Sequence, residues 1–173
     1  MRLYYYWIAL FVFVIDLITK KIVEYQMEIG DIIPVIGDFF VITSLRNKGA
    51  AFGILQNQRF LFIIITLVVV SAIVWYIQRN KHGQKLLLTG LGLVLGGAVG
   101  NFLDRALYGE VVDFLQFTFG TYVFPIFNLA DTAICIGVGL ILLDSVLNMK
   151  NENKETSETN GQPDGNQPER PLH

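Results

Sequence analysis

The chain has few of the residues that many hydrolytic and metal-dependent sites require. Its 173 residues include one cysteine, Cys135, and two histidines, His82 and His173. A single cysteine excludes an intrachain disulfide and a thiolate metal cluster, and we expect Cys135 to be a buried packing residue because it lies in an apolar segment. The histidines fall in a short basic loop and in the polar C-terminal tail. This placement argues against a zinc-binding HExxH helix and against a serine–histidine pair.

Charge is also scarce. Only 16% of the residues are charged, the net charge is −2, and 53% of the residues are hydrophobic. A nucleic-acid partner is not expected, because phosphate binding needs a basic surface and the basic residues here are dispersed. The composition is too apolar for an ordinary soluble domain of this length and predicts a polytopic membrane protein.

Four apolar runs are long enough to cross a hydrocarbon core of about 30 Å. They cover approximately residues 3–23, 60–77, 86–103 and 125–147. We therefore predict an all-α membrane protein with four antiparallel transmembrane helices. The first run has about the length of a full span and carries Asp16 and Lys20, so we interpret it as a retained helix and not as a cleaved signal peptide. Gly92, Gly96 and Gly100 have the spacing that lets helix backbones approach closely in lipid.

The connections indicate how the chain is placed in the membrane. The loop at residues 78–85 is short and basic, which predicts that it and both termini are cytoplasmic. Residues 24–59 then lie outside, and the β-favouring run 39–43 followed by a glycine-rich turn at 47–53 predicts a small β-like flap at the membrane surface; a plain solvated loop fits this pattern equally well. Residues 1–149 are expected to form one membrane-embedded domain, and the polar tail, 150–173, to be disordered and cytoplasmic.

Polar residues collect at one end of the predicted helices. In an antiparallel arrangement the extracytoplasmic side receives the ends of the first and third spans, the starts of the second and fourth, and the outer connections. The residues that this arrangement brings together are Asp16, Lys20, Asn47, Asn101, Asp104, Arg105, Asp113, Asn128 and Asp131. Ionisable groups at membrane depth are costly unless paired or hydrated, so such a cluster indicates a functional site.

The spacing of these residues suggests different roles. Asp16 and Lys20 lie one helical turn apart and can form an ion pair. We expect Arg105 to hold Asp104 ionised through a forked contact, which makes Asp104 architectural.

Asp113 and Asp131 have no obvious cation nearby. Two carboxylates in a poorly solvated site share one proton, so one can activate a water while the other protonates a leaving nitrogen. A Ser44–Lys48 pair is a weaker alternative, because nothing local activates the lysine.

Five short motifs occur in a characteristic order: Asp16-x-x-x-Lys20, Asn47-x-Gly49-Ala50-Ala51-Phe52-Gly53, Gly100-Asn101-x-x-Asp104-Arg105, Val112-Asp113-Phe114 and Phe127-Asn128-Leu129-Ala130-Asp131. Together they extend over nearly the whole chain up to about residue 147. In order and spacing they resemble the lipoprotein signal peptidase family of bacteria, also called signal peptidase II. The C-terminal tail lies outside this resemblance.

The resemblance implies an aspartic endopeptidase of the bacterial cytoplasmic membrane. It would remove signal peptides from prolipoproteins by cutting just before a diacylglyceryl-modified cysteine, with the active site at the extracytoplasmic face. It implies membrane lipid as a partner, inhibition by globomycin-like cyclic peptides, and no metal or organic cofactor. The catalytic pair would be Asp113 and Asp131. The residues that support this pair or contact substrate would be Asp16, Lys20, Asn47, Gly49, Asn101, Asp104, Arg105, Asn128 and Ala130.

Two other functional classes fit parts of the sequence. A small proton-coupled transporter or channel would also place carboxylates in its spans, but its polar residues should line a path through the membrane. A structural membrane subunit would use the charges only to pair helices.

Overall fold

The computed structural model describes residues 3–49, 56–80 and 84–159. Within these residues the chain forms four helices, α1 (Leu3–Gln26), α2 (Arg59–Arg79), α3 (Lys85–Leu107) and α4 (Leu129–Thr159). Three of them are long and apolar enough to cross a membrane, namely α2, α3 and residues 129–149 of α4. The helices coincide with the four predicted apolar runs and extend beyond most of their ends. A helical multi-pass membrane protein is thereby confirmed, with three candidate spans where the sequence predicts four.

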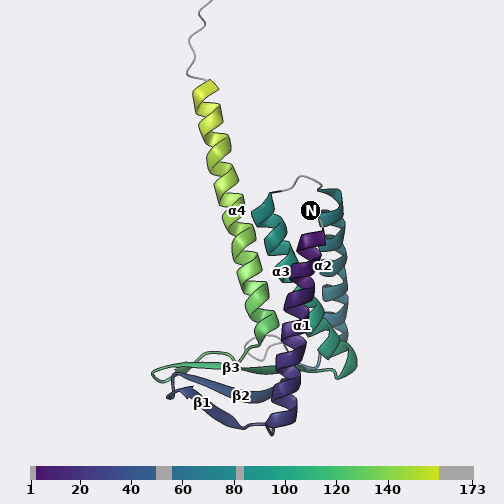
Figure 1. The fold of residues 1–173 in the computed structure, drawn as a ribbon, viewed down its shortest axis with the longest axis vertical. Helices are drawn as coiled ribbons and strands as arrows, with labels where there is room; N and C mark the ends of the chain where they lie inside the picture. The colour runs from purple at the N-terminus through teal and green to yellow at the C-terminus, as the bar shows by residue number, and fades with distance from the viewer. Residues whose placement is uncertain (1–2, 50–55, 81–83, 160–173) are drawn as a thin grey trace, which may run out of the picture.

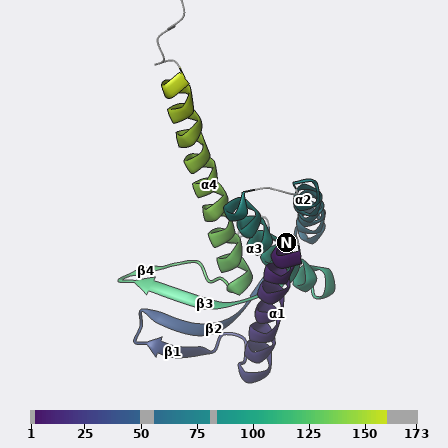
Figure 2. The same ribbon diagram turned by 45° about the horizontal axis from the view of Figure 1, so that its top comes forward.

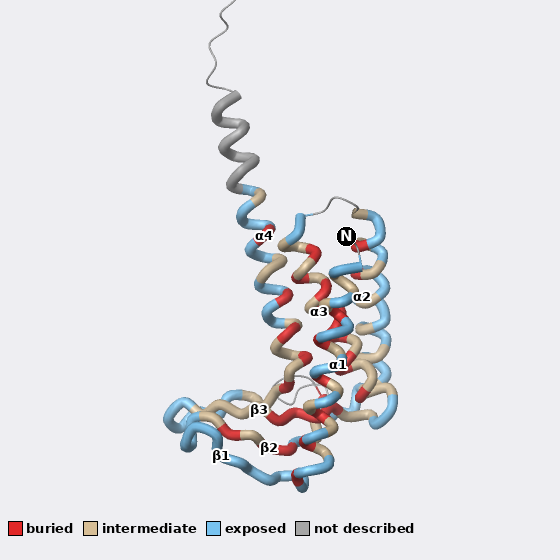
Figure 3. The backbone as a smooth tube through the Cα atoms, viewed as in Figure 1, coloured by how far each residue is buried: buried red, intermediate tan, exposed pale blue. Residues whose placement is uncertain are grey.

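Helix α3 is the centre of the bundle. It packs against α1, α2 and α4, and these three helices surround it in Figures 1 and 2. Many apolar residues on α2 and α4 are exposed, as in helices that face lipid, and Figure 3 shows long exposed stretches along both helices.

Glycines in α3 allow its neighbours to approach closely. A Cβ atom at Gly96 would lie 2.5 Å from the carbonyl oxygen of Ala9 in α1, and one at Gly97 would lie 2.4 Å from that of Ala130 in α4. Gly100 lies against Asp16, whose Oδ2 would be 2.5 Å from a Cβ at this position. The small-residue spacing read from the sequence therefore serves packing within one chain, since each of these glycines brings α3 against a neighbouring helix.

An antiparallel sheet closes one end of the bundle (Figures 1 and 2). Its strands are β1 (Ile32–Ile36), β2 (Phe40–Asn47), β3 (Val111–Phe119) and β4 (Tyr122–Val123), in that order across the sheet. The predicted β-favouring run belongs to β2. Of the predicted turn at 47–53, residues 50–53 lie outside the described residues.

The segment around Asp113, which the sequence placed in an outer connection, is a strand. Its valines and phenylalanines favour extended backbone, and β2 offers an edge for it to pair with. In this register Leu45 lies opposite Asp113 and Asn47 opposite Val111, with a bulge between Ile42 and Leu45. The sheet thus joins two connections that are far apart in the sequence.

The inner end of the sheet is anchored to the bundle by apolar contacts. Val23 and Met27 at the end of α1 form a buried cluster with Val112 and Phe114 of β3. Burying side chains of this size stabilises the packing by roughly 1.5–3 kcal/mol each. These contacts hold β3, and with it Asp113, against the end of the bundle.

Helix α4 continues past Leu147 to Thr159, into the segment that was expected to be disordered. Glutamate and lysine residues at 152–155 are good helix formers and can extend a helix that is already nucleated by the span before it. Residues 160–173 lie outside the described part of the chain.

The close approach of α1 and α3 gives a first prediction. Gly96→Ala should lower the melting temperature of the purified protein, because the new methyl group meets the backbone of Ala9; overpacking of this kind costs about 1–3 kcal/mol. Gly139→Ala is the matched control, because a Cβ there has nothing within 4 Å. If the two variants have the same melting temperature, the contact at Gly96 does not limit stability.

Candidate functional site

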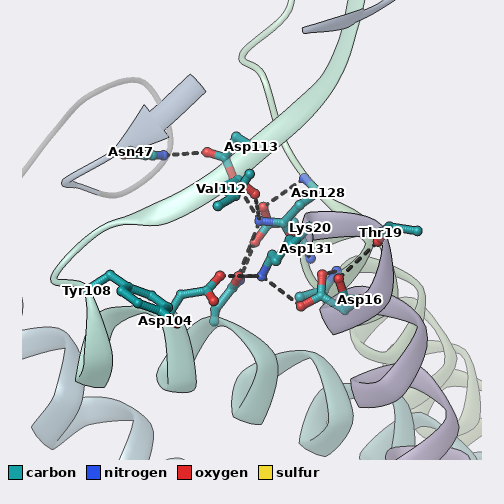
Figure 4. Close-up of polar contacts among 12 residues, drawn as sticks. Asp16, Thr19, Lys20, Asn47, Asp104, Tyr108, Val112, Asp113, Asn128 and Asp131 are labelled. Atoms are coloured by element: carbon teal, nitrogen blue, oxygen red, sulfur yellow. Dashed lines mark hydrogen bonds and ion pairs between the residues drawn. The ribbon is translucent and has the colours of Figure 1, made fainter. Parts of the chain in front are cut away.

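The polar residues gather where the sheet meets the bundle. A cavity of about 480 Å³ opens at this junction, and the side chains of Asp113 from β3 and Asp131 from the first turn of α4 both line it. Asn47, Asn101 and Arg105 share its polar wall. Figure 4 shows these aspartates within one network that also reaches α1. The structure therefore brings together the two carboxylates that the sequence analysis singled out.

Asp113 is buried, and no cation among the described residues forms an ion pair with it. It is 2% exposed, and its carboxylate accepts hydrogen bonds from the Nδ2 atoms of Asn47 at 2.8 Å and Asn128 at 2.7 Å. The pKa of Asp113 is raised to about 7: burial raises it most, the charge of Asp131 also raises it, and the hydrogen bonds from the two asparagines and the charge of Lys20 oppose the rise. Asp113 is thus able to hold or release a proton near neutral pH.

Asp131 occupies a different environment at the start of α4. Its Oδ2 accepts a hydrogen bond from the backbone N–H of Asn128 at 3.3 Å, and its own backbone N–H donates to Asn128 Oδ1 at 3.0 Å. This reciprocal pair is a capping box with asparagine as the N-cap. The positive end of the helix dipole also favours a carboxylate here. The second oxygen, Oδ1, accepts from Asn101 Nδ2 at 2.7 Å.

Two asparagines connect these carboxylates. Asn128 is fully buried, and its Nδ2 is shared between Asp113 and the Oδ1 of Asn101, the latter at 3.2 Å. Asn101 in turn donates to Asp131. Because an amide presents a donor at one end and an acceptor at the other, these bonds fix the orientation of both amide groups. Both carboxylates therefore face hydrogen-bond donors in defined directions.

Lys20 forms the base of the network (Figure 4). Its ammonium is 2% exposed and lies 2.7 Å from Asp16 and 2.8 Å from Asp104, and it donates to Asn101 Oδ1 at 2.9 Å. Asp16 also accepts a hydrogen bond from the backbone N–H of Ala130 in α4 at 2.9 Å. The predicted Asp16–Lys20 pair is confirmed, and it links α1 to both α3 and α4.

The expected pairing of Arg105 with Asp104 is wrong. Asp104 pairs with Lys20, whereas Arg105 donates from Nη2 to the carbonyl oxygen of Gly49 at 3.0 Å. The guanidinium also lies over the ring of Phe62, 4.7 Å from its centroid. Adjacent residues on a helix point about 100° apart, so Asp104 faces α1 while Arg105 faces the cavity.

One further expectation differs from the structure, and the weaker Ser44–Lys48 alternative finds no support in it. Cys135 is exposed and lines the cavity, where burial was expected. Ser44 is buried and its hydroxyl accepts from Arg46, whereas Lys48 is exposed and lies nearest to Glu110. This arrangement gives no support to a Ser44–Lys48 pair.

One wall of the cavity lies outside the five motifs except for Phe127, and its residues 125–127 were expected to begin the fourth helix, which starts only at Leu129. It is formed by the connection from β4 to α4, residues 124–127, which is tied to β3 by hydrogen bonds between Leu115 and Phe127. An aromatic residue followed by proline, Phe124-Pro125, was the only local signal of an extended segment here. Within the described part of the chain, no group of three histidine, cysteine or acidic residues is arranged to hold a metal.

Comparisons with known proteins identify the family. The family model described as signal peptidase (SPase) II matches residues 8–147 of this chain. The chain belongs to the signal peptidase II family. The resemblance stated from the motifs is thereby confirmed, and the protein is a peptidase with apolar helices typical of a multi-pass membrane protein.

Relatives and solved structures agree with this assignment. The chain is 48% identical over 155 residues to the lipoprotein signal peptidase of Bacillus pumilus (strain SAFR-032), covering 90% of this chain and 100% of that protein. It is 49% identical over 151 residues to that of Bacillus subtilis (strain 168), covering 87% and 98%.

Two solved structures of bacterial membrane enzymes, obtained by the in meso method at 2.3 Å and 1.9 Å resolution, have similar folds. They superpose with TM-scores of 0.79 and 0.72 at 42% and 44% identity. The first match covers 83% of this chain and 88% of that chain, and the second covers 79% and 88%.

The base of the network gives a second prediction. Lys20→Met should destabilise this signal peptidase II by about 3–5 kcal/mol, because it leaves Asp16 and Asp104 buried without their cation. Thermal unfolding of the protein in detergent or lipid measures the loss. The matched control is Lys21→Met, since Lys21 is partly exposed and its partners among the described residues are Glu24 and Tyr108. Equal melting temperatures for the two variants would show that the ion cluster does not stabilise the bundle.

Proposed function

We propose that this protein is an intramembrane aspartic endopeptidase that removes signal peptides from prolipoproteins, cutting immediately before a diacylglyceryl-modified cysteine. Asp113 and Asp131 are the catalytic pair. The observation that carries this proposal is that two carboxylates from different segments line one cavity and are joined by a network of asparagines. Membership of the signal peptidase II family supplies the substrate class.

The two aspartates have separate roles in the reaction. Asp131, whose carboxylate is held at a helix N-terminus, removes a proton from the attacking water. Asp113, whose pKa is raised to about 7, is protonated and donates a hydrogen bond to the scissile carbonyl. The water oxygen bonds to the carbonyl carbon, the C–N bond breaks, and the departing nitrogen receives the Asp113 proton. Exchange with solvent then restores the starting protonation. No metal or organic cofactor takes part.

The supporting residues hold this pair in place. Asn47, Asn101 and Asn128 orient the carboxylates by direct hydrogen bonds. Arg105 lies at the cavity wall and fixes the backbone at Gly49. The remaining positions, Asp16, Lys20, Asp104 and Ala130, set the distance between helices that the pair requires.

In the membrane, α1 is a fourth span and both termini are cytoplasmic. Burial of Asp16 and Lys20 inside the bundle supports this, because their charges compensate each other and do not face lipid. The basic stretch that includes Arg79 and Lys85 marks the cytoplasmic side. The sheet then lies at the extracytoplasmic surface as a flap. Residues 1–149 form the membrane-embedded domain, with 150–173 as a cytoplasmic tail.

The walls of the cavity suit a lipid-linked peptide. Ile134, Ile136 and Phe124 give it an apolar lining beside the carboxylates. A substrate held in the bilayer by its signal helix and acyl chains reaches such a cavity laterally, so membrane lipid borders the site. Globomycin-like cyclic peptides would inhibit by occupying the same space.

A proton pathway through the membrane has less support. Among the described residues, the buried polar side chains gather at the end of the bundle that carries the sheet, apart from Asp144 on α4. A relay for protons needs such groups along the whole depth of the membrane.

Asparagine substitutions test the catalytic pair. Asp113→Asn and Asp131→Asn should each abolish cleavage of a purified lipidated prolipoprotein while leaving the protein folded and inserted, since each keeps the shape of the side chain but removes the proton transfer. Asp144→Asn, at a buried aspartate far from the cavity, is the control and should remain active. Cleavage is followed by the shift of the substrate on a gel, with unlipidated precursor expected to stay intact. An active Asp113→Asn or Asp131→Asn enzyme would disprove the assignment.

The protonation of Asp113 sets the pH dependence. An acid with a pKa of about 7 carries its proton below that pH, so kcat should fall as the pH rises through about 7. Asn47→Ala removes a hydrogen bond that lowers this pKa, and the fall should therefore move to higher pH. Asn148→Ala removes a similar bond to Asp144 outside the site and should leave the profile unchanged. If the fall in kcat moved to lower pH in Asn47→Ala, the role given to Asp113 would be contradicted.

A further inference from the structure

A second cavity adjoins the candidate active site. It has a volume of about 520 Å³ and shares Asn47, Phe124, Pro125 and Ile126 with the first cavity. Its remaining wall comes from the end of β2 and the following Lys48, from both residues of β4, and from Gln56. The two cavities therefore adjoin at Asn47, whose side chain bonds directly to Asp113.

The second cavity is basic where the first contains carboxylates. Its charged lining residues are Arg46 and Lys48, and no acidic side chain is among the described residues that line it. Arg46 is held in position by donating to Ser44 Oγ at 3.2 Å and to the carbonyl oxygen of Leu45 at 3.4 Å. Lys48 is 59% exposed, and its nearest carboxylate, Glu110, is 3.9 Å away at the limit of an ion pair. Both cations remain able to attract a negative group.

The positions of the two cavities suggest in which direction the substrate chain runs through the site. From the carboxylates, the first cavity continues along α4 past Ile134, Cys135 and Ile136, which belong to the apolar part of that helix. A signal peptide that arrives from the bilayer matches this apolar end. The polypeptide on the other side of the scissile bond then passes Asn47 and enters the basic cavity.

We propose that the second cavity binds the first residues of the mature segment, directly after the lipidated cysteine, and that Arg46 and Lys48 favour acidic side chains there. This inference rests on the proposed function, because it assumes that the bond is cut between the two cavities. Six of the ten described residues that line this cavity are apolar or aromatic, and the other four are two cations and two amide side chains, which an acyl chain would leave without polar partners. The phosphate of an anionic phospholipid shares the required charge and is the competing occupant.

Three lipidated precursors that differ only in the two residues after the cysteine test the proposal. These residues are both aspartate, both serine or both lysine. The wild-type enzyme should cleave the aspartate precursor with a kcat/KM about fivefold above that of the lysine precursor, the size expected for a partly exposed ion pair. High salt should reduce this preference, because exposed charges are screened.

Removing the positive charge of the cavity should remove the preference. Lys48→Glu makes the two charged lining positions neutral in sum and is expected to abolish the preference for aspartate, whereas Arg46→Gln is expected to reduce it. Lys21→Glu makes the same change in net charge as Lys48→Glu at a partly exposed position of α1, outside both cavities, and should keep the wild-type order.

The outcomes separate this inference from the proposed function. Equal cleavage of all three precursors by the wild-type enzyme would overturn the inference and leave the peptidase assignment intact. A second outcome would also overturn the inference and leave the peptidase assignment intact. In it, Lys48→Glu slows the cleavage of all three precursors equally, and the loss depends on the fraction of anionic lipid in the vesicles. That result would identify a phospholipid as the occupant. Cleavage of none of the precursors would overturn both.

Discussion

The contact on which the structure depends is the buried ammonium of Lys20. It lies between the carboxylates of Asp16 and Asp104 and also binds the amide oxygen of Asn101. Asp16 also accepts a hydrogen bond from the backbone N–H of Ala130 and so links the cluster to α4. A buried ion without partners costs several kcal/mol. Any shift of α1, α3 and α4 relative to one another would break the contacts of Lys20 and Asp16 and incur this cost. Helices α3 and α4, which carry Asn101 and Asp131, are thus held at a fixed distance from each other.

Glycine makes this arrangement sterically possible. The ion cluster requires Asp16 to lie against the backbone of α3, and Gly100 leaves the space for it. Further along the same helix, Gly96 and Gly97 bring α3 against α1 and α4. Since lipid provides little hydrophobic driving force between helices, close backbone packing and polar contacts supply the association. The small residues and the charged residues therefore act together.

The sheet gives the two aspartates unlike surroundings. Asp131 belongs to a helix and is held by its capping box, whereas Asp113 reaches the same cavity on a strand and is buried between two amide groups. Two identical side chains in different environments can take opposite roles in proton transfer. Because Asn47 comes from β2 and borders both cavities, the sheet also connects the carboxylates to the basic surface beyond them.

The sequence by itself determined the apolar runs, the polar residues at their ends and, through five motifs, the family. These features are local: hydrophobic length and residue spacing along a helix can be read from a single segment. Only the tertiary structure decided that residues 111–119 pair with β2, that Asp104 binds Lys20 while Arg105 turns to Gly49, that Cys135 lines the cavity, and that a second cavity adjoins the first. Each of these depends on segments distant in the sequence, and spacing along one segment does not say which partner its side chains will meet across the fold.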